Sequence, residues 1–83
     1  SKKSDLEPQI ISVTSAGSQE VYQIGDQAFS DRSQLAAILK RLPNGPGVII
    51  KVSDRVTVGF AMAAVQEARD AGFERVTYVP ASP

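Results

Sequence analysis

Two helical stretches in this chain each lie between short runs of β-branched residues, and this alternation limits the possible folds more than any other feature. The runs occupy residues 9–14, 20–24, 48–52 and 75–79. In the two longer intervals between them, apolar residues recur at the three- and four-residue spacing of an amphipathic helix. A strand–helix–strand unit joins parallel strands through a right-handed crossover, so both helices should cover one face of the sheet. We therefore predict a two-layer α/β sandwich in the order β-β-α-β-α-β, with a four-stranded mixed sheet.

The first two runs are expected to pair as a hairpin. Residues 15–18, Ser-Ala-Gly-Ser, supply a turn between them, and residues 25–26, Gly-Asp, supply a second turn that leads into the first helix. Apolar and polar residues alternate along both runs, as they do in a half-buried strand. The side chains expected to face the core are Ile11, Val13, Tyr22 and Ile24.

The first helix is predicted to begin at a Ser30 cap and to end before the Pro-Asn-Gly-Pro-Gly run of residues 43–47. Its apolar stripe has the spacing i, i+3, i+4, i+7, which favours packing along one side. The stripe consists of Leu35, Ile38, Leu39 and Leu42.

The second helix should run from about Thr57 to Ala71 and end at Gly72 in a left-handed conformation. Val48, Ile50 and Val52 of the preceding strand should face it. The opposite face of the sheet would then carry Ser12, Thr14, Lys51 and Thr77. The predicted core stripe of the helix consists of Val58, Ala61, Met62, Val65 and Ala68.

Two residues invite either a structural or a functional interpretation. Phe60 lies away from the predicted core stripe, so it packs against the first helix or contacts another chain. Asp54 follows a strand and precedes a helix, where it can form an Asx turn with the amides that follow it or take part in binding. For Asp54 we favour the structural role in the loop.

Composition excludes several classes of function. The 83 residues contain no cysteine and no histidine, which removes disulfides, thiolate chemistry, histidine-based triads and the commonest metal ligand. Nine basic residues balance nine acidic ones, which argues against a nucleic-acid-binding surface. We expect no catalytic residue, no cofactor and no metal, and we expect the chain not to be an enzyme.

The chain resembles the periplasmic domain of the ExbD/TolR family over about residues 9–80. The resemblance lies in an apolar strand with Ser-Asp-Arg-Val after it at residues 48–56, and in the Ala-Gly-Phe ending of the second helix at residues 71–73. Tyr-Gln-Ile-Gly at residues 22–25, before a Ser-capped helix, is also similar and slightly favours the ExbD-like branch. Residues 1–8 would be a flexible lead-in, residues 9–80 one domain and residues 81–83 a tail.

This resemblance implies a partner-binding domain outside the cytoplasm. Such proteins are single-pass inner-membrane subunits of bacterial motors, so this chain would be the periplasmic piece of a longer protein whose membrane helix lies upstream. The family works as homodimers within an ExbB/TolQ-like pentamer and uses the proton gradient to drive a TonB- or TolA-type transducer in outer-membrane transport. We expect an edge strand to pair with a second copy or with a transducer peptide. The candidate interface consists of Val76, Thr77, Tyr78, Val79 and Phe60.

Two alternatives remain open at this point. Within the family, a TolR-like role in envelope integrity with peptidoglycan binding is the first. The second lies outside the family and is a cytoplasmic α/β domain that senses a small molecule or accompanies an enzyme. A concave apolar pocket with convergent polar groups would favour the second alternative.

Overall fold

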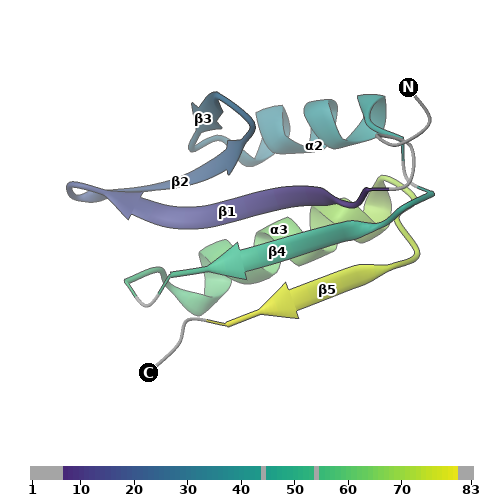
Figure 1. The fold of residues 1–83 in the computed structure, drawn as a ribbon. Coiled ribbons are helices and arrows are strands. Elements are labelled where there is room, and N and C mark those ends of the chain that lie inside the picture. The colour runs from purple at the N-terminus through teal and green to yellow at the C-terminus, as the bar shows by residue number, and fades with distance from the viewer. Residues whose placement is uncertain (1–6, 44, 54, 81–83) are drawn as a thin grey trace.

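The computed structural model describes residues 7–43, 45–53 and 55–80 and shows an α+β fold with a five-stranded mixed sheet and two helices. Strands lie in the order β3-β2-β1-β4-β5, with β1 and β4 at the centre (Figure 1). The elements are β1 (Gln9–Ala16), β2 (Gln19–Ile24), β3 (Gln27–Phe29), α2 (Arg32–Arg41), β4 (Val48–Val52), α3 (Val58–Asp70) and β5 (Val76–Val79).

The predicted count of four strands was wrong, because the chain after Ile24 turns back to form β3. β3 pairs antiparallel with β2 through a two-residue turn of Gly25 and Asp26. Gly25 has a φ of 60°, and Asp26, like every other non-glycine residue that the structure describes, has a negative φ, which matches a type II′ hairpin turn. The turn itself was predicted, but three residues are too few to show a strand period.

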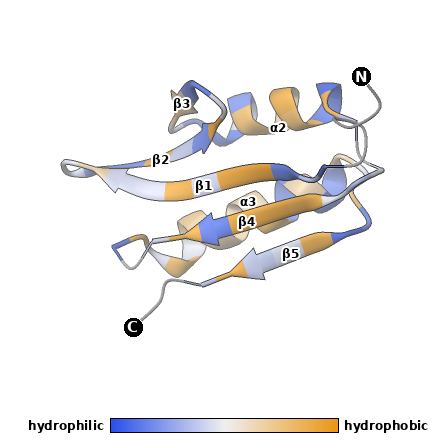
Figure 2. Cartoon of the chain, in the orientation of Figure 1, coloured by the Kyte–Doolittle hydropathy of each residue, from blue (hydrophilic) through white to orange (hydrophobic). Residues whose placement is uncertain are grey.

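Pairing follows the prediction for the hairpin and for the second crossover, but not for the first. That crossover was predicted to join residues 20–24 to a parallel strand; it starts instead from β3, and β2 runs antiparallel to β4. β1 and β2 form the antiparallel hairpin, and β1–β4 and β4–β5 are parallel. α3 lies behind β1 and β4 and packs beside α2 (Figure 1). Apolar residues concentrate along the two central strands (Figure 2). Ser12 pairs with Lys51, and Ile49 with Thr77, on the face away from the helices.

The core lies between the central strands and the two helices. Strand residues that alternate along β1, β2 and β4 point into it, as expected, and Ile24 packs against its margin. Because the helices cover only one face of the sheet, a one-residue slip in register would move all of these side chains to the exposed face. The fully buried larger side chains are Ile11, Val13, Tyr22, Leu35, Leu39, Val48 and Ile50.

The first helix begins one residue later than predicted. Asp31 is the N-cap of α2, and its carboxylate accepts a hydrogen bond from the Ser33 amide at 2.8 Å. Ser30, the predicted cap, instead donates its hydroxyl to the Glu20 carbonyl at 2.9 Å. This bond ties the end of the β3 segment to β2. Ser30 is therefore a tertiary contact rather than a cap.

The second helix has the predicted ends but a different buried face. Thr57 caps it, and Gly72, with a φ of 102°, follows its C-cap. The buried residues are Ala61, Ala63, Ala64 and Ala68. Val58 and Met62, which were predicted in the core stripe, are 73% and 41% exposed. The helix thus approaches the sheet through small side chains, and Val58 and Met62 are left accessible.

Candidate functional site

β5 forms one free edge of the sheet in the described part of the chain. The Val48 amide donates to the Arg75 carbonyl at 2.8 Å. This bond determines which residues of β5 direct their backbone groups toward β4. Backbone groups alternate in direction along a parallel strand, so Thr77 and Val79 face β4. The amides and carbonyls of Val76 and Tyr78 therefore point away from β4, where another strand can pair with them.

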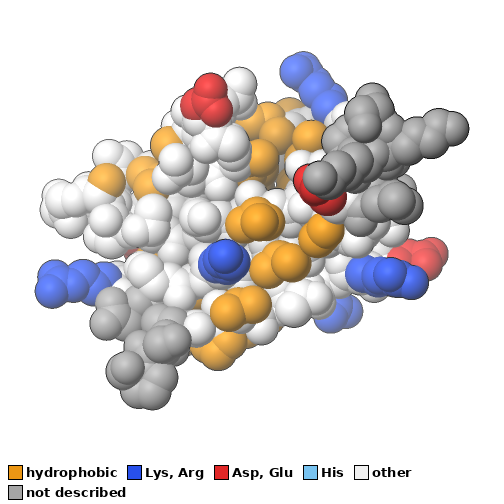
Figure 3. Space-filling view, in the orientation of Figure 1, with side chains coloured by type: hydrophobic (Ala, Val, Ile, Leu, Met, Phe, Trp, Pro, Cys, Tyr) orange, Lys and Arg blue, Asp and Glu red, His pale blue; other side chains and the backbone are white. Residues whose placement is uncertain are grey.

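Both faces of this edge carry accessible apolar side chains. Tyr78 lies opposite Ile50 and so shares the helix-covered face, yet it is 40% exposed. Val79 lies opposite Lys51 on the open face and is 39% exposed. On that open face, apolar side chains lie beside and below a basic one over the central strands and β5 (Figure 3). A strand added to β5 would thus find apolar neighbours on either side of the sheet.

A flank of α3 continues the apolar surface beside β5. Ala61, Ala64 and Ala68 face the sheet, and at 100° per residue Val58 and Met62 lie on the flank next to β5. α3 also contacts β5 directly. β4 runs into the loop before α3, so the start of α3 lies near the carboxyl end of β5, where Tyr78 and Val79 are. We call Val58 and Met62 the α3 flank.

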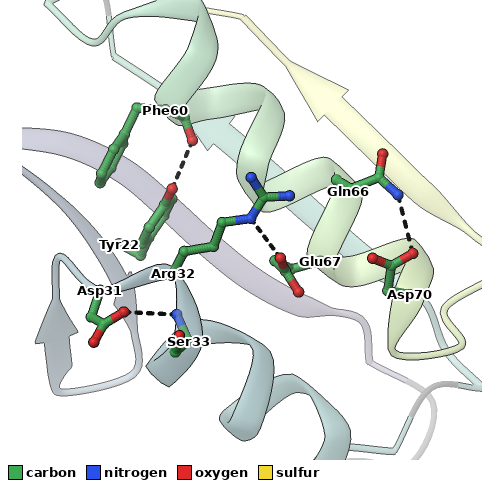
Figure 4. A network of polar contacts seen from close by, with 8 residues as sticks. All are labelled: Tyr22, Asp31, Arg32, Ser33, Phe60, Gln66, Glu67 and Asp70. Carbon is green, nitrogen blue, oxygen red and sulfur yellow. Dashed lines mark hydrogen bonds and ion pairs between the residues drawn. The ribbon is translucent and has the colours of Figure 1, made fainter.

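Phe60 does not belong to this surface. It lies on the other side of α3, where its ring stacks on Tyr22 of β2 with the centroids 4.1 Å apart and the planes 5° from parallel. The Tyr22 hydroxyl donates to the Phe60 carbonyl at 2.9 Å (Figure 4). The candidate interface residues of β5 thus come together, and Phe60 is separate from them. Phe60 was predicted to pack against the first helix or to contact another chain; the structure shows its ring stacked on a side chain of the sheet.

The same side of α3 is joined to its surroundings by polar contacts. The Arg32 guanidinium of α2 pairs with the Glu67 carboxylate at 2.5 Å (Figure 4). At the start of the helix, the Glu20 carboxylate accepts from the Thr57 amide at 2.6 Å. Glu20 lies 37 positions away from Thr57, so no local pattern could have revealed this contact. Asp54, predicted to shape the same loop, lies outside the described residues.

The electrostatics of the described residues centre on one buried phenol. Burial raises the pKa of Tyr22 above its ordinary value; Arg32 opposes this rise, and the carboxylates of Glu20 and Glu67 add to it. Within the described ranges, no three acidic side chains gather closely enough to hold a metal ion. The arrangement offers backbone hydrogen bonds and apolar contacts at β5, which are the means of strand addition.

No family model and no curated protein matches this chain. Among the described residues, neither helix combines the length and the apolar character needed to cross a bilayer.

Proposed function

We propose that the domain binds its partners by strand addition at β5. The observation that carries this proposal is the free backbone of Val76 and Tyr78, bordered by Val79 on one face and by the α3 flank on the other. Charged side chains, prolines and bulges are common means by which proteins protect edge strands from pairing. β5, Val-Thr-Tyr-Val, contains no charged residue and no proline.

We propose further that one such partner is a second copy of the chain. Two copies related by a twofold axis would pair their β5 strands antiparallel and join two five-stranded sheets into one. Each copy would place its α3 flank beside the strand of the other. The exposed apolar side chains of both copies would then be removed from water together, which favours association.

The resemblance to the ExbD/TolR family gives this binding a biological setting. On that basis we propose a periplasmic dimerisation and partner-binding domain of a proton-driven inner-membrane motor. Its second partner would be an extended segment of a TonB- or TolA-like transducer, taken up at the same edge. The ExbB/TolQ-like pentamer would be contacted by parts of the protein upstream of this domain.

A proline at position 78 tests the use of the β5 edge. The Tyr78 amide points away from β4, so Tyr78→Pro blocks an added strand without removing a ladder bond. Tyr78→Ala is the matched control, because it removes the ring and keeps the amide. Sedimentation velocity over a range of concentrations should show that Tyr78→Pro stays monomeric, whereas Tyr78→Ala retains association. Unchanged association in the folded proline variant would contradict the proposal.

The motor assignment has a separate test. The sequence encoded upstream of this domain should contain about 20 consecutive apolar residues with a single acidic residue among them. A natural precursor without such a segment would remove the motor from the proposal and leave strand addition at β5 to be judged on the proline variant.

A further inference from the structure

The opposite edge of the sheet carries a groove between β3 and α2 that the proposed function does not use. The groove has a volume of about 520 Å³ and is open to solvent along one side. Strand residues form one wall and helix residues the other. The lining residues are Gln27, Ala28, Phe29, Gln34, Ala37, Ile38 and Arg41.

The strand wall offers free backbone groups. Ile24 and Gln27 flank the two-residue turn and form its closing, hydrogen-bonded pair. Hydrogen-bonded and non-hydrogen-bonded pairs alternate along an antiparallel ladder. The next pair, Gln23 and Ala28, is therefore a non-hydrogen-bonded pair. The Ala28 amide and carbonyl therefore point outward at the rim of the groove. An extended peptide can form two hydrogen bonds with Ala28 there.

The helix wall sets the length of peptide that fits. Gln34, Ala37, Ile38 and Arg41 follow the spacing i, i+3, i+4, i+7 and so form one stripe along α2. Seven residues of helix rise by about 10 Å, which equals about three residues of an extended strand. In a strand, alternate side chains point to the same side. Two side chains of such a peptide can therefore enter the groove, separated by one residue that points out.

The groove lining is apolar in one part and basic in another. Phe29, Ala37 and Ile38 give an apolar region, and Arg41 gives a cation at the end of α2. Among the described residues, no acidic side chain lines the groove. A guanidinium matches a carboxylate in geometry as well as in charge. The carbonyls at the end of α2 repel an anion on the helix axis, so the carboxylate must meet Arg41 on the groove wall.

We propose that this groove binds an extended segment of a partner protein that carries an apolar residue and, two positions later, an acidic residue. The segment adds to β3 through the backbone of Ala28. Its apolar side chain packs on Phe29 and Ile38, and its carboxylate pairs with Arg41. The site is independent of β5, which lies at the far edge of the sheet.

Titration monitored by amide NMR spectra of the 83-residue chain tests this inference. The probe is an acetylated, amidated nine-residue peptide of Thr and Ser with one Ile and, two positions later, one Glu. The protein carries Tyr78→Pro, so that β5 cannot compete. We expect saturable shifts at Ala28 and along residues 34–41. A peptide with Gln in place of Glu should bind about tenfold more weakly, as expected for loss of a charge-assisted hydrogen bond.

Charge reversal supplies the matched controls. Arg41→Glu should weaken the acidic peptide about tenfold or more and should favour a peptide with Lys in place of Glu. Lys40→Glu changes the same charge on the neighbouring exposed residue, which does not line the groove, and should alter affinity less than twofold. Equal effects of the two reversals, or shifts confined to other strands, would overturn the proposal. Failure of the β5 experiment would leave these expectations unchanged.

Discussion

Tyr22 joins the sheet to the second helix through one ring and one hydroxyl. The ring stacks on Phe60 and lies 6.4 Å from the Phe29 ring, and the hydroxyl donates to the Phe60 carbonyl. Tyr22→Phe keeps the rings and removes this single bond, so it should lower the free energy of unfolding by about 1 kcal/mol. Urea denaturation measures the change. Tyr78→Phe is the matched control at an exposed position and should change stability little. An equal loss in both variants would contradict this role of the Tyr22 hydroxyl.

The same phenol predicts how stability depends on pH. Burial raises its pKa in the folded state, so the unfolded chain loses the proton first as the pH rises. The stabilisation is fully present below the ordinary pKa of about 10 and is lost as the pH rises through the folded value. Between about pH 8 and about pH 11, wild type should therefore lose more stability than Tyr22→Phe. Parallel urea curves for the two proteins at the two pH values make the comparison, and identical losses would contradict it.

At the scale of elements, Gly47 allows the connection before β4 to approach the residue before β5 closely. Its φ is 96°, and an added Cβ would lie 2.8 Å from the Arg75 Cβ and 2.9 Å from the Arg75 carbonyl oxygen. Gly47→Ala should therefore destabilise the fold by about 1–3 kcal/mol, from backbone strain and the clash with Arg75, the residue before β5. Gly45→Ala, in the same connection, meets nothing within 4 Å and should be close to neutral. Thermal unfolding distinguishes the two variants, and similar melting temperatures would contradict the argument.

The elements themselves show which features local patterns can and cannot reveal. The ends of α3 were predictable because Thr57 and Gly72 act within one turn of the helix. Its buried face was not, since the helix is apolar around most of its first turns and two stripes fit the same spacing. In the structure the alanine stripe is the buried one, because small side chains let the helix lie close to the sheet. Val58 is not covered by the sheet and is exposed.

The candidate site was predictable to a similar extent. An apolar final strand between a glycine and a proline could be identified from the sequence, but its place in the strand order could not. That order depends on which strands pair, and it makes β5 and β3 the two edges. The groove beside β3 could not be predicted from the sequence, because it is formed by a three-residue strand and by the placement of α2 next to that strand.

At the scale of the whole molecule, the two edges differ in chemistry. β5 is bordered by apolar side chains on both faces, which suits pairing with an apolar strand. β3 has a groove whose described lining includes one cation, Arg41, which suits a strand that carries an acidic residue. The helices and the central strands lie between these edges, so both can be occupied at once. A second copy at β5 would therefore leave the β3 groove of each copy accessible, and the pair would present two such grooves to its partners.

Introducing a charge into the α3 flank tests the link between that flank and association at β5. Val58 is the first residue of α3, and an acidic side chain there interacts favourably with the positive end of the helix dipole. Val58→Glu should therefore leave the free energy of unfolding unchanged or raise it by about 0.5 kcal/mol. It should nevertheless weaken self-association, because the charge would lose its hydration beside the added strand. Gln66→Glu, at another exposed position of α3, should leave association as in wild type. If sedimentation velocity shows the same association for Val58→Glu as for this control, the α3 flank takes no part in the interface, and a partner strand would contact β5 through its backbone and its own side chains alone.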